Sequence, residues 1–230
     1  GKAYFIEGLY SQAVDQFTAA IDLDPRAKEA FSERSYAYRK LGLLQKAVAD
    51  ANQAIQLDPD FALAYKNRCG AYGRMGQHQQ AIEACDKAIQ LNPKLGEAYG
   101  NRGIAYVLMG QHRLAIEDFS QTILFLPDDE RGYYNRGVSY SRGGQHQQAT
   151  EAFDKAIQLD PAYAKAYVNR GKAYAQLGLQ QKAQSDRDKG CQLNQKFCIT
   201  PTPFPTPTSK PTSTPRPTLT PTPRPTPTLR

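Results

Sequence analysis

The 230-residue sequence contains no tryptophan, only two methionines and three histidines, and it has more basic than acidic residues. No apolar run approaches the roughly 18 residues of a membrane-spanning helix, so we expect no membrane span. The sequence also contains no phosphate-binding loop, no paired nucleophile and base, and no cluster of metal ligands. These absences argue against an enzyme, and we expect no catalytic residue, cofactor or metal site in these residues.

Proline recurs five times at a spacing of 34 residues, at Pro25, Pro59, Pro93, Pro127 and Pro161. Glycine, alanine and tyrosine recur with the same period, as at Gly76 and Gly110 or Ala81 and Ala115. A period of 34 is that of a stacked two-helix repeat, so one small unit has been copied along the chain. Such an array presents a long surface rather than a catalytic pocket.

The copy at residues 62–95 shows what each unit builds. Its first apolar stripe follows the i, i+3, i+4, i+7 spacing of a helix face. Gly76 ends this helix, because glycine adopts the left-handed conformation at low cost. A second stripe predicts another helix, which stops before Pro93 because proline disfavours helical geometry in the preceding residue. Such short connections make neighbouring helices antiparallel.

This pattern resembles the tetratricopeptide repeat family over about residues 1–197. One copy carries the family signature at Tyr99, Gly103, Tyr106, Ala115, Phe119 and Pro127. Phenylalanine or tyrosine replaces the usual tryptophan, and arginine stands where the signature has leucine. The resemblance implies an all-α, right-handed solenoid of antiparallel helix pairs with a concave groove, in which alanines sit at close crossings and aromatic rings fill the core.

The repeats predict a division of the chain into seven parts. We expect an incomplete first repeat, four full repeats, a terminal capping repeat with a partly polar outer face, and a disordered tail: 1–27, 28–61, 62–95, 96–129, 130–163, 164–197 and 198–230. Because the first repeat lacks its leading half, we expect a fragment or mature product with more array or another domain before Gly1.

The tail, from Thr200 onward, holds 11 of the 16 prolines and no acidic residue. A chain of this composition cannot bury a core, and we expect it to be extended, with polyproline II character. A spacer is the preferred interpretation. The composition also resembles the O-glycosylated stalks of exported proteins, which favours an exported or cell-envelope protein over a cytoplasmic one without deciding the compartment.

The arginines that replace leucine are Arg34, Arg68, Arg102, Arg136 and Arg170. A buried guanidinium needs a partner. We expect structural ion pairs with the paired helix at Arg34–Asp50, Arg102–Asp118 and Arg170–Asp186. Arg68 and Arg136 face Ala84 and Ala152 instead, so we expect them to be freer to meet solvent or a ligand.

The cysteines and histidines have structural interpretations. Cys69 and Cys85 lie on facing stripes of one helix pair; two buried thiols are the favoured interpretation, and a disulfide is the alternative. Cys191 and Cys198 flank the last helix end and can staple it. The histidines, at His78, His112 and His146, recur in the turn between paired helices, too far apart to share one metal ion.

Asparagine recurs off the apolar stripe of the first helix in four copies, at Asn67, Asn101, Asn135 and Asn169. An amide both donates and accepts, so it can bind the backbone of an extended peptide. The spacing resembles the asparagine ladder of peptide-binding members of the family; the alternative is a surface residue inherited by duplication. Cations at neighbouring positions favour an acidic or carboxylate-bearing segment, and they include Lys66, Arg131, Lys165 and Lys172.

The sequence therefore predicts a non-catalytic scaffold that binds an extended, acidic segment of another protein in its groove. Two alternatives remain open. One is a regulatory or positioning module of an enzyme that lies before Gly1. The other is nucleic-acid binding by a basic solenoid, against which the moderate charge of the repeat region argues. The partner and the oligomeric state are not predicted.

Overall fold

The computed structural model describes residues 9–198. Within that range it contains α-helices, one short 3₁₀ helix and no strand. The elements are α2 (Tyr10–Leu23), α3 (Lys28–Lys40), α4 (Leu44–Leu57), α5 (Ala62–Arg74), α6 (His78–Leu91), α7 (Gly96–Leu108), α8 (His112–Phe125), α9 (Glu130–Arg142), α10 (His146–Leu159), α11 (Ala164–Gln176), α12 (Gln180–Leu193) and η1 (Gln195–Phe197). Most of the predicted tail at 198–230 and the start of the first repeat lie outside the described residues.

The first helix of each pair ends at a glycine, as the sequence predicts. Gly76 has φ 77°, and the Gln77 amide after it donates to the Tyr72 carbonyl at 3.0 Å. This bond closes the helix end through a residue in the left-handed region, where a side chain would be strained. The other four pairs turn at a glycine with φ between 76° and 80°.

The turns between pairs depend on the residue before proline. Asp58 is extended, with φ −146° and ψ 101°, because Pro59 excludes it from the helical region. Its carboxylate then accepts a hydrogen bond from the Asp60 amide at 3.0 Å. This short turn sends α5 back against α4.

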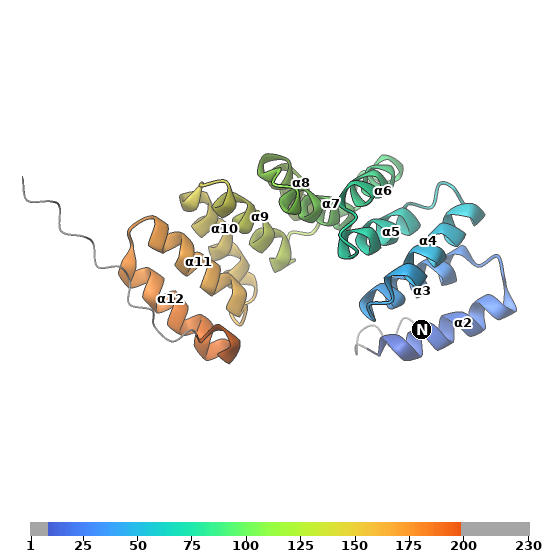
Figure 1. The fold of residues 1–230 in the computed structure, drawn as a ribbon, viewed down its shortest axis with the longest axis horizontal. Helices are drawn as coiled ribbons and strands as arrows, with labels where there is room; N and C mark the ends of the chain where they lie inside the picture. The colour runs from blue at the N-terminus through green and yellow to red at the C-terminus, as the bar shows by residue number, and fades with distance from the viewer. Residues whose placement is uncertain (1–8, 199–230) are drawn as a thin grey trace, which may run out of the picture. The chain divides into compact units, whose positions relative to one another are not determined.

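Each helix packs on the next one along the chain. The first helices of neighbouring pairs also touch: α3 contacts α5, and α5 contacts α7. Figure 1 shows the pairs lying side by side from α2 to α12. The described residues therefore form the all-α solenoid of helix pairs that the repeat pattern predicts.

Small residues and rings alternate in the core. The alanines at the helix crossings, such as Ala81 and Ala115, are fully buried. Phe119 is 1% exposed, and a Cβ built on Gly103 would lie 2.9 Å from its ring. That glycine is therefore required for α7 to approach the ring. Tyr99 is only half-buried, with its ring 5.6 Å from the guanidinium of Arg102.

The four cysteines form two disulfides, which corrects the favoured expectation of two buried thiols at Cys69 and Cys85. Cys69 of α5 and Cys85 of α6 are bonded, with their Cα atoms 5.3 Å apart. Cys191 of α12 is bonded to Cys198 beyond η1, so the end of the last helix is stapled. Among the helices of residues 9–198, none combines the length and the apolar composition needed to cross a bilayer.

Candidate functional site

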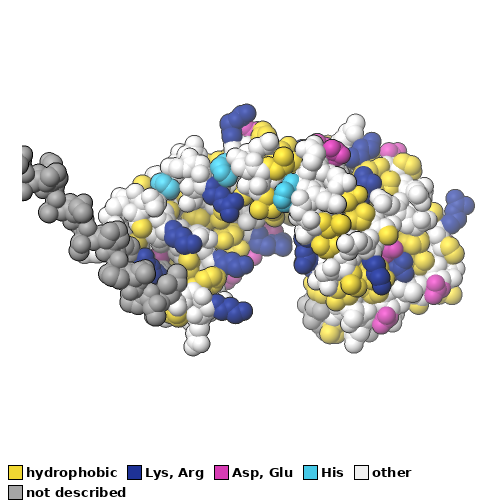
Figure 2. Space-filling view, viewed as in Figure 1, with side chains coloured by type: hydrophobic (Ala, Val, Ile, Leu, Met, Phe, Trp, Pro, Cys, Tyr) yellow, Lys and Arg dark blue, Asp and Glu magenta, His cyan; other side chains and the backbone are white. Residues whose placement is uncertain are grey.

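A hollow on the face bordered by α3, α7 and α9 is the candidate site. Figure 2 shows this hollow, with Lys and Arg side chains along its edge. It contains a pocket of about 150 Å³. The pocket is lined by Tyr36, Arg39, Lys40, Glu97, Gly100, Asn101, Ile104, Phe119, Thr122, Leu126, Asp129, Arg131, Gly132 and Asn135.

The four asparagines take different positions. Asn101 and Asn135 are half-buried and line the pocket. Asn67 is 4% exposed, and its Nδ2 donates to the Ser32 carbonyl at 2.8 Å. Asn169 donates to the Tyr134 hydroxyl at 2.9 Å. Asn67 is thus enclosed between α3 and α5 rather than turned to the hollow, which differs from the sequence expectation.

The predicted cations also differ among themselves. Lys66 Nζ lies 2.7 Å from Glu97 Oε2, and the lysine side chain is 12% exposed. Arg131 is 64% exposed and pairs with Asp129 at 2.6 Å. Lys165 and Lys172 are exposed and form no ion pair within residues 9–198. Arg131 lines the pocket and Lys66 pairs with Glu97 of its lining, whereas Lys165 and Lys172 are not among the lining residues.

The sequence analysis missed the cations at the end of α3. Arg39 lies 4.9 Å from the ring centre of Tyr36, and Lys40 Nζ lies 5.2 Å from it. Lys66 Nζ approaches the same ring at 5.9 Å. Three cations thus gather around the Tyr36 ring, where each interacts favourably with the aromatic π-system. Lys66 is already paired with Glu97, so Arg39 and Lys40 contribute the positive charge that remains. The Arg-Lys pair occurs in one copy only, so a search for repeated residues passed over it.

The charges at the hollow influence one another. Burial lowers the pKa of the Arg39 guanidinium below its ordinary value, since removing water disfavours the charged form. Burial also acts to raise the pKa of Glu97, but Lys66, Arg39 and Arg131 together hold it below its ordinary value. Glu97 therefore remains ionised at neutral pH, within a positive field.

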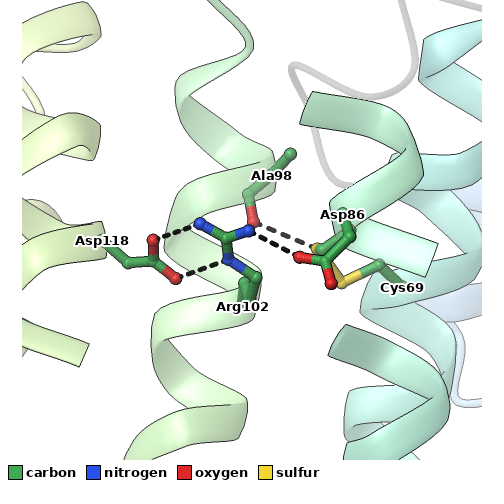
Figure 3. Close-up of a disulfide and its surroundings, with 6 residues drawn as sticks. Cys69, Asp86, Ala98, Arg102 and Asp118 are labelled. Atoms are coloured by element: carbon green, nitrogen blue, oxygen red, sulfur yellow. Dashed lines mark hydrogen bonds and ion pairs between the residues drawn. A yellow bond between two sulfur atoms is a disulfide. The ribbon is translucent and has the colours of Figure 1, made fainter. Parts of the chain in front are cut away.

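Ion pairs join the two helices of a pair and, at Arg102, also reach the preceding pair. Figure 3 shows Arg102 of α7 between two carboxylates. Its Nε and Nη2 bind Asp118 of α8 at 2.8 and 2.6 Å, and its Nη1 binds Asp86 of α6 at 2.5 Å. The expected pairs at Arg34–Asp50 and Arg170–Asp186 are also formed. The sequence prediction of three structural ion pairs is confirmed.

Arg68 and Arg136 are more enclosed than we expected. Arg68 Nη1 donates to Asn52 Oδ1 at 3.0 Å, and Arg136 Nη1 reaches Ser120 Oγ at 3.5 Å. In both residues Nε is buried with no hydrogen-bond partner. Both side chains reach the second helix of the preceding repeat, and each guanidinium lies over an aromatic ring of its own helix.

The described residues contain no group of three histidine, cysteine or acidic side chains that could hold a metal ion. Each histidine begins a second helix of a pair, at His78, His112 and His146. The part of the chain that the structure describes thus offers amides, cations and a small pocket. These groups can bind an extended chain but supply no nucleophile activated by a base.

Comparison with protein families agrees with this architecture. Family models described as tetratricopeptide or TPR repeats match residues 1–60, 62–95, 84–117, 139–178 and 164–197. The chain belongs to the tetratricopeptide repeat family. The sequence-based recognition is therefore confirmed. No curated protein sequence matches the chain.

Several solved protein structures, among them a TPR protein, are similar to this chain. MamA is 26% identical with a TM-score of 0.63, over 69% of this chain and 93% of MamA. PilW, a type IV pilus biogenesis factor, is 23% identical with a TM-score of 0.75, over 85% of this chain and 90% of PilW. YrrB, described as having an unusual peptide-binding site, is 22% identical with a TM-score of 0.62, over 78% of this chain and 92% of YrrB. PilW and YrrB show the fold alone. The family match, rather than these structures, supports a protein–protein interaction scaffold.

Proposed function

We propose that this tetratricopeptide repeat chain is a non-catalytic scaffold that holds an extended, acidic segment of another protein in the hollow bordered by α3, α7 and α9. The observation that carries the proposal is the shared pocket, where Asn101 and Asn135 lie beside Arg39 and Lys40. Amides can bind the backbone of an extended segment whatever its sequence. The cations attract its carboxylates and speed its association.

The proposal assigns different roles to the predicted residues. Asn101 and Asn135 hold the backbone of the bound segment. Lys165 and Lys172 extend the positive field along α11, and Arg131 contributes at the pocket. Lys66 acts indirectly, because it already pairs with Glu97. Asn67 positions α3 against α5 through Ser32 and is left out of the binding set.

Peptide binding is better supported than nucleic-acid binding. Single-strand binders need aromatic faces on which bases can stack. Here several tyrosine faces are occupied by cations of the same chain, as Tyr99 is by Arg102 and Tyr133 by Arg136. The peptide proposal holds equally for a free-standing scaffold and for a module within a larger protein.

A display library of random 12-residue peptides tests the proposal. Selection on the folded chain should enrich peptides rich in aspartate and glutamate. An Asn101→Ala/Asn135→Ala double variant should then bind the selected peptides about tenfold or more weakly, because each lost hydrogen bond contributes about 0.5–1.5 kcal/mol. Its helical circular dichroism should be unchanged.

A matched control removes two amides elsewhere. Gln79 and Gln147 are exposed on α6 and α10, and each bonds only to a glutamate one turn further along its helix. The Gln79→Ala/Gln147→Ala variant should bind as the unmodified chain does. Selection of no acidic peptide, or equal binding by the two double variants, would refute the proposal.

A further inference from the structure

The pocket in the hollow has an apolar floor. Phe119 is almost fully buried beneath it, while Ile104 is 42% exposed at its side and Leu126 closes one edge. The hydroxyl of Thr122 at the floor has a single hydrogen, which is directed at the carbonyls of Gly96 and Asp118, 3.3 and 3.1 Å away. The Thr122 hydroxyl therefore offers a ligand no free donor, and apolar surface of Ile104 is left open to water.

Gly100 creates the space above this floor. Counted in steps of 34 residues, the corresponding positions hold Ser32, Lys66, Tyr134 and Val168. A Cβ at Gly100 would lie 3.5 Å from Thr122 Oγ1, an ordinary contact. A Cβ therefore fits, and the remainder of a larger side chain would occupy the pocket. The pocket is a feature of this one repeat and not of the repeat pattern.

Arg39 and Lys40 at the rim lack a carboxylate partner. Both rim carboxylates are already paired, Glu97 with Lys66 and Asp129 with Arg131. Arg39 and Lys40 form no ion pair within residues 9–198, and Arg39 Nε is buried without a hydrogen bond. An unpaired half-buried guanidinium is costly, and a carboxylate is the ligand that best relieves that cost.

Gly70 of α5 gives Arg39 its place at the rim. A Cβ on Gly70 would lie 3.1 Å from Arg39 Nε and 3.3 Å from Arg39 Cζ. The corresponding positions in other copies carry larger side chains, at Tyr36, Ile104, Val138 and Lys172. Two glycines, each at a position where other copies carry larger side chains, therefore place an arginine beside an apolar pocket.

We propose that this pocket is a specificity site that takes one aliphatic side chain, such as leucine, next to a carboxylate that Arg39 and Lys40 bind. The inference rests on the proposed peptide-binding function and adds a sequence preference to it. The volume of about 150 Å³ equals that of an apolar protein cavity known to accept benzene, so it suits one aliphatic side chain. The carboxylate belongs either to a neighbouring acidic residue or to the C-terminus of the segment.

Fluorescence anisotropy with defined probes tests the site. The first probe is a labelled peptide of seven residues. Its first six residues are acidic residues or serine, and its last is a leucine with a free C-terminal carboxylate. The second ends in leucine carboxamide, and the third ends in alanine with a free carboxylate. The alanine peptide should bind about tenfold or more weakly than the first, because it leaves the pocket unfilled.

Gly100→Val tests the pocket itself. This variant should lower affinity for the leucine peptide to that of the alanine peptide, and it should leave the alanine peptide unaffected. Unchanged alanine-peptide binding also shows that the variant is folded. A leucine preference that survives Gly100→Val, or no preference in the unmodified chain, overturns the pocket while leaving the proposed function intact.

Arg39→Gln tests the carboxylate contact. This variant should bind the leucine peptide about tenfold or more weakly, since hydrogen bonds to charged groups are strong. Arg113→Gln is the matched control, because Arg113 is 84% exposed and pairs only with Glu117. Equal effects of the two variants overturn the role of Arg39.

The carboxamide peptide separates the two sources of the carboxylate. If the carboxamide peptide does not bind, Arg39 and Lys40 bind the C-terminal carboxylate. If it binds as well as the first peptide, they bind the carboxylate of an acidic side chain. Failure of all three peptides to bind, together with failure of the random library, overturns the proposed function and the specificity site together.

Discussion

The ion pair between Arg102 of α7 and Asp118 of α8 gives the sharpest test of what holds the two helices of a pair together. Arg102 makes two hydrogen bonds to Asp118, and their side chains are 19% and 6% exposed. In an Arg102→Met variant the methionine keeps much of the packing of the arginine stem but leaves the aspartate buried without a partner. Breaking a buried pair in this way costs about 3–5 kcal/mol. Because the arginine keeps some contact with water, we expect a loss near 3 kcal/mol.

The chain contains its own control for this variant. Arg136 occupies the same position one repeat later, where Ala152 replaces the aspartate, and its nearest polar partner is Ser120 Oγ at 3.5 Å. Arg136→Met should therefore cost less than about 1 kcal/mol. Asp86→Ala should also cost less than about 1 kcal/mol, because Asp86 is 52% exposed and exposed ion pairs contribute little.

Urea unfolding followed by far-ultraviolet circular dichroism measures these losses. Repeat arrays can unfold in parts, so hydrogen exchange of α7 and α8 should accompany the unfolding curves. A double variant, Arg102→Met/Asp118→Leu, should recover most of the stability, since it leaves no buried charge. Equal losses in Arg102→Met and Arg136→Met, or a double variant no more stable than the single one, would refute the reasoning.

Two further predictions follow from the same structure. Replacing Cys69 and Cys85 by alanine removes a crosslink across 16 residues. By the chain-entropy account this should lower the free energy of unfolding by about 3 kcal/mol and lower the thermal midpoint. An unchanged midpoint would contradict the contribution of the crosslink. Asp129 accepts a hydrogen bond from the Arg131 amide at the start of α9, and although burial opposes it, Arg131 holds the pKa of Asp129 below its ordinary value. Its stabilisation is therefore present above the unfolded pKa of about 3.9 and is lost as pH falls through the lower folded value. Asp129→Asn should make the thermal midpoint less sensitive to pH below about 4, and identical pH profiles would argue against this account.

Residues that act within one helix pair could be predicted from the sequence. The spacing of 16 residues between Arg102 and Asp118 recurs in the three copies that carry the aspartate, because both residues lie on one antiparallel pair with a fixed turn. The turn glycine and the proline likewise act through local backbone geometry. These features repeat because their surroundings repeat.

Residues that depend on the neighbouring pair could not be predicted in the same way. Thirty-five positions before each asparagine stands a residue on the first helix of the preceding copy. That residue differs from copy to copy: it is Ser32, Lys66, Gly100 or Tyr134. Ser32 is small and polar, so Asn67 turns inward and bonds to it. Gly100 leaves space, so Asn135 shares a pocket with it.

The sequence by itself determined the repeat, its helix pairs and turns, the internal ion pairs and the family, because each follows from spacing along one hairpin. The tertiary structure decided which asparagines reach the hollow, which cations remain unpaired there, and that the cysteines are bonded. It also placed Arg39 beside a pocket opened by Gly100, although these residues are 61 positions apart. The packing of successive helix pairs brings such residues together, and no periodic pattern within one repeat specifies that contact.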